Sequence, residues 1–183
     1  MKGSHRRTSK RRIVLLAVII AVVVVACVLV VRRAGKGADP LELLLTYTPP
    51  ENQYPFPEFI TEGLPDGFEA GEPTVQQTTY PDGTPVTVGV VGYTRGEELV
   101  IVQVLNVCGD NFINNTPELE AYTFKLVRLS GNRVARYSKG EEMSGYVWYY
   151  GKYSIAVYTS PAGFPGYLTD FAKLYLAEYP SHL

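Results

Sequence analysis

The residues from Ile13 to Val31 form an unbroken apolar run, IVLLAVIIAVVVVACVLVV, without a charged residue or a glycine. As an α-helix rising about 1.5 Å per residue, this run would extend roughly 28 Å, close to the thickness of the hydrocarbon core of a bilayer. Hydrocarbon offers the backbone no hydrogen-bond partners, so a crossing segment must form its backbone bonds internally. The run therefore predicts one transmembrane helix at residues 13–31.

The charges on either side of the run predict its orientation. Residues 1–12 contain six Lys or Arg, and residues 32–38 contain three. Because the more positive flank of a span usually stays in the cytoplasm, we expect a basic cytoplasmic tail at residues 1–12. The rest of the chain would then lie outside the cell membrane, as an extracytoplasmic domain held by a single-pass signal-anchor.

The apolar run has two alternative interpretations. A cleaved signal peptide usually has a shorter apolar core and a site of small residues before a polar mature start, and neither feature is present. The residues Val24–Cys27 fit a loose lipobox, which in bacteria would leave a lipidated Cys27 at the new N-terminus. Apolar residues continue from Val28 to Val31, where lipoproteins turn polar, so we favour the retained helix and keep lipidation of Cys27 as the alternative.

The overall net charge of −1 conceals a strong asymmetry. Residues 1–38 hold nine basic residues and no acidic one, which leaves eight basic and all eighteen acidic residues, a net charge of −10, for residues 39–183. Such an acidic domain repels a phosphate backbone. We therefore expect no nucleic-acid partner, and a lipid bilayer together with a membrane or periplasmic protein as partners.

The chain after the apolar run divides into a tether and a domain. Residues 32–58 contain two glycines and five prolines, a composition typical of a stiffened linker that holds a domain away from the bilayer. Within it, Leu41–Leu45 could form a helical turn against either the membrane surface or the domain. Residues 59–183 are expected to form the folded domain.

Within this domain, alternating apolar and polar residues predict six strands, at residues 74–80, 86–93, 99–107, 133–139, 145–150 and 153–159. Thr116-Pro117 is a typical helix start, apolar residues then recur at helical spacing, and Gly131 would end that helix. Residues 163–179 form a second amphipathic pattern. The order β-β-β-α-β-β-β-α predicts an α+β fold, with an antiparallel sheet of about six strands and two helices on one face.

Histidine is nearly absent from the domain, which contains only His182 near its end and a single cysteine, Cys108. This composition argues against histidine-based general base catalysis, Cys–His nucleophiles and nearly all zinc sites. Carboxylate pairs such as Glu97-Glu98 and Glu141-Glu142 fall at expected turns, where acidic residues are usually solvated. We therefore expect neither enzymatic activity nor a cofactor or metal.

The aromatic cluster in the predicted strand at residues 145–150 has two interpretations. Tyr146, Trp148, Tyr149 and Tyr150 could pack against neighbouring strands, or they could form an exposed surface for a partner, since Tyr and Trp are enriched at interfaces. These four residues are the candidate partner surface that the sequence offers.

The order of these features resembles that of small exported bacterial α+β domains of unknown function. The shared features are a basic N-terminus, one anchor helix, the Leu64-Pro65-Asp66-Gly67-Phe68 turn, a β-meander and a last amphipathic helix. Some such domains occur in membrane-anchored anti-sigma-factor-like and lipoprotein-like proteins. The resemblance carries no functional residue. The function expected is a membrane-tethered, non-enzymatic accessory subunit of a membrane complex; the alternatives are a small-molecule or lipid-binding domain and a carboxylate-dependent hydrolase.

Overall fold

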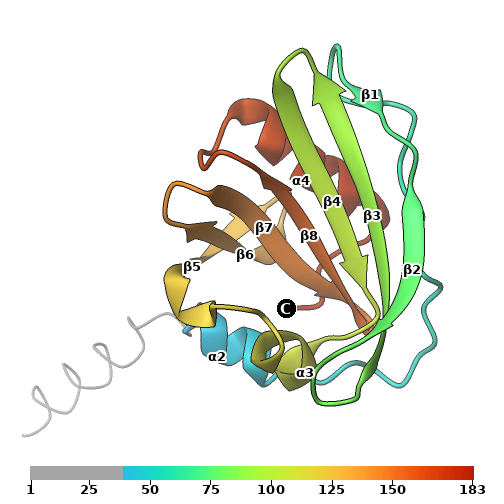
Figure 1. Cartoon of the computed structure of the whole chain (residues 1–183), viewed down its shortest axis with the longest axis vertical. Helices are drawn as coiled ribbons and strands as arrows, with labels where there is room; N and C mark the ends of the chain where they lie inside the picture. The colour runs from blue at the N-terminus through green and yellow to red at the C-terminus, as the bar shows by residue number, and fades with distance from the viewer. Residues whose placement is uncertain (1–38) are drawn as a thin grey trace, which may run out of the picture. The chain divides into compact units, whose positions relative to one another are not determined.

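Eight antiparallel strands and three α-helices make up residues 39–183, the part of the chain that the computed structural model describes (Figure 1). The expected cytoplasmic tail, the apolar run at residues 13–31 and Cys27 lie outside these residues. Between residues 39 and 183, no helix is long and apolar enough to cross a membrane.

The strands form one sheet in the order β1-β3-β4-β8-β7-β6-β5, and β2 also pairs with β3. Every pairing is antiparallel, and the two meanders, β2-β3-β4 and β5-β6-β7-β8, meet where β4 pairs with β8. The elements in chain order are α2 (Pro40–Leu45), β1 (Glu69–Ala70), β2 (Thr74–Thr79), β3 (Pro85–Arg95), β4 (Glu98–Leu105), α3 (Gly109–Asn114), the 3-10 helix η1 (Leu119–Ala121), β5 (Tyr122–Leu129), β6 (Asn132–Lys139), β7 (Met143–Tyr150), β8 (Tyr153–Thr159) and α4 (Gly166–Glu178).

The α+β class and the antiparallel sheet are confirmed, but helices cover both faces of the sheet, not one. On one face, α4 buries Leu168, Phe171 and Tyr175 completely, in one cluster with alternate residues of the central strands. On the other face, Leu44 of α2 and Ile113 of α3 share a second buried cluster with Tyr149. Strands covered on both sides can bury all their residues, and six consecutive residues of β7, from Ser144 to Tyr149, are buried.

The helix predicted at residues 116–131 is wrong. Only η1 is helical there, and Tyr122–Leu129 forms β5, paired along its full length with β6. Apolar residues three and four positions apart fit a helix, but aromatic and branched residues fill this segment and favour a strand. The supposed helix stop, Gly131, lies with Ser130 in a two-residue hairpin turn, where both residues have positive φ, at 81° and 48°.

From residue 39 onward, the segment predicted as a tether packs on the domain, and the helical turn expected at Leu41–Leu45 is part of α2 and lies against the domain, one of its two expected placements. Leu44 is fully buried, and its carbonyl accepts a hydrogen bond of 3.1 Å from the hydroxyl of Tyr149. The rings of Phe56 and Phe59 lie so close to Gly89 that a Cβ on this glycine would come within 3 Å of both. This proline-containing segment thus packs against the sheet, and the aromatic residues of the segment extend the core.

Candidate functional site

Strand β2 forms one edge of the sheet (Figure 1). It pairs with β3 in an unbroken register, from Thr74 opposite Val90 to Thr79 opposite Pro85. No strand of residues 39–183 pairs with its other side. All six of its residues are exposed, including Val75 at 59%. The outward backbone N–H and C=O groups of β2 therefore lack strand partners within the described part of the chain.

The composition of β2, TVQQTT, offers no protection against further strand pairing. Natural edge strands are usually blocked by charged residues, especially lysine, or by proline, and β2 contains neither. The opposite edge, β5, differs because it carries Lys125 and Arg128, both exposed. Of the two sheet edges, β2 is thus the one without these protective residues.

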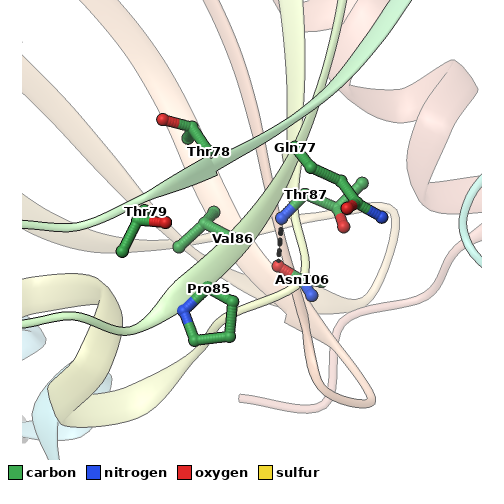
Figure 2. A pocket seen from close by; sticks show the side chains of 7 residues that line it. All are labelled: Gln77, Thr78, Thr79, Pro85, Val86, Thr87 and Asn106. Atoms are coloured by element: carbon green, nitrogen blue, oxygen red, sulfur yellow. Dashed lines mark hydrogen bonds between the residues drawn. The ribbon is translucent and has the colours of Figure 1, made fainter.

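A groove of about 360 Å³ lies beside the second half of β2 (Figure 2). Asn106, just after β4, fixes its floor: the Asn106 Oδ1 accepts a hydrogen bond of 2.7 Å from the Thr87 backbone N–H, and the Asn106 backbone N–H donates to the Thr87 carbonyl at 3.2 Å. The lining is uncharged, rich in hydroxyl and amide groups, and consists of Gln77, Thr78, Thr79, Pro85, Val86, Thr87 and Asn106.

A second groove, of about 460 Å³, shares Pro85 and Asn106 with the first and extends toward the start of α3. It is lined there by Cys108, Asp110 and Lys152, among others. Only the first groove includes residues of β2, namely Gln77, Thr78 and Thr79, and the second continues from it across the turn between β2 and β3.

The aromatic residues predicted as a partner surface are not exposed. Tyr146, Trp148 and Tyr149 are at most 4% exposed and Tyr150 is half-buried. Their polar atoms are used internally; for example, the Trp148 indole N–H donates to the Tyr179 carbonyl at 2.9 Å. The packing interpretation applies because α4 covers one face of β7 while α2 and α3 cover the other, which the sequence pattern did not reveal.

The structure shows the surroundings of Cys108 and of the carboxylates that lie close together within residues 39–183. Burial raises the pKa of the Cys108 thiol to about 11, so that this residue is a protonated thiol at neutral pH. Glu118 and Glu142 do converge, but on the ammonium of Lys139, at 2.6 and 2.9 Å, and both are more than 60% exposed. No group of three His, Cys, Asp or Glu within the described range is placed to hold a metal ion.

The β2 edge was missed in the sequence because its residues are individually unremarkable. Thr74–Thr79 reads as an ordinary strand, and only the sheet order shows that it lies at an edge. The available signal in the sequence is that only Val75 is apolar among these six consecutive β-forming residues. Comparison with known proteins gives no match for this chain among family models, curated proteins or solved structures.

Proposed function

We propose that this chain is a membrane-tethered, non-enzymatic accessory protein, a subunit of a larger membrane complex, and that its domain binds a partner protein by strand addition at β2. The observation that carries the proposal is the free β2 edge, six residues long, fully exposed and uncharged. Strand addition draws its affinity from main-chain hydrogen bonds and its specificity from pockets for alternate side chains. The β2 edge offers main-chain groups for these hydrogen bonds, and the groove beside its second half offers a pocket for side chains.

The charges around β2 indicate what kind of strand would bind. Glu69 and Glu72 precede β2, and Asp82 follows it in the turn to β3. An extended segment with basic residues near its ends would place them beside these carboxylates. Because the whole domain carries a net charge of −10, such a segment would also be attracted over a longer range.

The same charges disfavour pairing between two copies of this chain. An antiparallel β2–β2 pair centred between Gln76 and Gln77 would set Glu72 of one copy opposite Pro81 of the other, next to Asp82. These carboxylates are near one another but not directly opposite, and each copy carries a net charge of −10 over residues 39–183, so two copies would repel one another as they approach. A strand from a different protein is therefore the occupant that the edge fits.

The anchor would support this function by raising the effective concentration of the domain near partners in the same membrane. The apolar run at residues 13–31, with six basic residues before it, would hold the domain on the extracytoplasmic side of the cell membrane. Two proteins confined to one membrane meet at a much higher effective concentration than in solution. A six-residue strand contact, weak in isolation, would then suffice for stable assembly.

A ligand enclosed between helix and sheet has less support. The side chains of Phe171 and Tyr175 from α4 lie directly against the sheet, with the Phe171 ring centroid 4.7 Å from that of Tyr93. This space is occupied by protein. The groove lined by Gln77, Thr78 and Thr79 lies at the surface beside β2, where a partner's side chains would use it.

Purification of the full chain from its native membranes in mild detergent tests the proposal. We expect a stoichiometric membrane or periplasmic protein to co-purify with the natural chain and to be lost from a Val75→Lys/Thr78→Lys variant, which places one lysine on each face of β2. A Thr61→Lys/Ala177→Lys variant, which adds the same charge at exposed positions outside β2, should retain the partner. A chain that purifies alone, or a partner retained equally by both variants, would refute the proposal.

A further inference from the structure

The hairpin formed by β5 and β6 has a charge opposite to that of the domain around it. Residues 122–139 contain no acidic residue and five of the eight basic residues of the described chain. These are Lys125, Arg128, Arg133, Arg136 and Lys139. A concentration of positive charge on one edge of a domain of net charge −10 requires a physical reason.

Four of these five positive charges have no acidic partner within residues 39–183. Lys139 is neutralised by Glu118 and Glu142, but the ion pairs of this part of the chain include none of the other four residues. Register places Lys125 directly opposite Arg136 and Arg128 directly opposite Arg133. Like charges opposite one another destabilise a sheet, so the hairpin retains an arrangement that folding alone disfavours.

The two pairs point to opposite faces of the sheet. Arg136 lies over the Phe164 ring on the α4 side, 3.4 Å from the ring centroid, and Lys125 shares that side. Arg128 and Arg133 lie on the α2 side, because residues of a strand alternate between its faces. Because the Lys125–Arg136 pair and the Arg128–Arg133 pair lie on opposite faces of the sheet, both can contact one flat anionic surface only when the free edge of β5 points toward that surface.

The chain enters the domain at this same edge. Helix α2 begins at Pro40, next to the first described residue, and Leu41 and Leu44 share a cluster with Tyr122 and Phe124 of β5. Eight residues, 32–39, separate Val31, at the end of the apolar run, from Pro40, and the nine residue-to-residue steps between the two extend over about 30 Å at most. An anchor at residues 13–31 would therefore hold Pro40, the first residue of α2, within about 30 Å of the bilayer, and α2 packs beside β5.

We infer that the β5–β6 hairpin docks edge-on against anionic phospholipid headgroups, an inference that rests on the membrane tether of the proposed function. Anionic lipids attract basic residues within a short distance of the membrane, while the acidic remainder of the domain is repelled. The half-buried rings of Tyr122 and Phe124, stacked with centroids 6.1 Å apart, lie on the same strand, and aromatic residues favour the headgroup region. Since β2 lies at the opposite edge of the sheet, this docking presents it away from the bilayer.

The test uses the full chain in nanodiscs of phosphatidylcholine alone or with about 30 mol % phosphatidylglycerol, which supplies a negative surface potential. Hydrogen–deuterium exchange is followed in peptides covering β5. We expect exchange of the outward amides of β5 to slow in the anionic discs only, and high salt to remove the effect because it screens the charges. In a Lys125→Gln/Arg128→Gln variant, we expect the ratio of docked to undocked chain to fall about fivefold per charge removed.

A matched variant, Lys173→Glu, lowers the net charge by the same two units at an exposed site outside the hairpin and should behave like the natural chain. Equal exchange of β5 in both kinds of disc would overturn the inference, as would slowing that occurs only when a soluble acidic polypeptide is added. Failure of the natural chain to insert into discs would instead count against the membrane tether, so the two failures are distinguishable.

Discussion

Gly145, in the middle of β7, gives a prediction in which local propensity and packing have opposite signs. Glycine inside a strand costs about 0.5–1 kcal/mol relative to alanine, because it loses more backbone entropy on folding. Propensity alone therefore predicts that Gly145→Ala stabilises the protein. The structure predicts the reverse, because the space above this glycine is occupied.

A Cβ on Gly145 would lie 2.6 Å from the Val157 carbonyl oxygen, 2.7 Å from the Tyr158 Cβ and 2.8 Å from the Tyr137 Cζ. The first two atoms are a backbone oxygen and a Cβ of the neighbouring strand β8, so they cannot move without disturbing the β7–β8 pairing. The ring of Tyr137, which is buried, lies over the glycine from β6, directly opposite in register. Overpacking of this kind costs about 1–3 kcal/mol, which exceeds the propensity gain and leaves a net destabilisation of about 1–2 kcal/mol.

Urea denaturation of the full chain in mild detergent, followed by fluorescence of Trp148, the single tryptophan, measures the effect. With a slope of about 2 kcal/mol per molar urea, the unfolding midpoint of Gly145→Ala should fall by about 0.5–1 M. Gly92→Ala is the control, because a Cβ there meets only Leu99 Cδ1 at 3.5 Å, an ordinary contact. Its midpoint should stay constant or rise. A Gly145→Ala variant as stable as the natural chain would refute the packing described for this face.

Three further predictions concern buried polar groups. Tyr93→Phe should lower the free energy of unfolding by about 1–2 kcal/mol in the same urea assay, because it leaves the buried Tyr175 hydroxyl without one of its partners; an unchanged midpoint would contradict this. In a Cys27→Ser background, Cys108 should react with iodoacetamide at pH 8 about a hundredfold more slowly than an unhindered thiol, since burial raises its pKa to about 11; a rate equal to that of a free thiol would contradict this. Burial lowers the pKa of His182, whose Nδ1 accepts a backbone hydrogen bond, so its contribution to stability is present above the unfolded-state pKa of about 6.5 and is lost as the pH falls through the folded-state value. The unfolding midpoint of the natural chain should therefore fall more between pH 7.5 and pH 5.5 than that of His182→Gln, and equal falls would count against this role.

The strands could be predicted from the sequence because their signal is local. The segment Leu99–Val107 is apolar on both faces, which indicates a central strand, and β4 indeed lies between β3 and β8. The turn around Asp82-Gly83 is likewise explained by its own residues, since Gly83 adopts a φ of 89° and the Asp82 carboxylate accepts a hydrogen bond from the Thr84 backbone N–H at 2.9 Å.

The errors arose where neighbours in space decide the conformation. Residues 122–129 satisfy helical spacing and strand alternation equally, and β6 beside them resolves the ambiguity. The prolines of residues 39–58 suggested an extended tether, because no local pattern indicated that Phe56 and Phe59 would pack over Gly89. Burial of Trp148 and exposure of β2 both depend on sheet order, which only the three-dimensional fold supplies.

Hydrogen–deuterium exchange of β2 in the purified membrane complex tests the central claim most directly. The full chain would be compared alone in detergent and together with the partner that co-purifies from native membranes. Strand addition predicts that the outward amides of Thr74–Thr79 exchange about tenfold or more slowly in the complex, because they become hydrogen-bonded. Unchanged exchange in β2, with protection confined to other elements, would show that the partner binds elsewhere and would contradict the account.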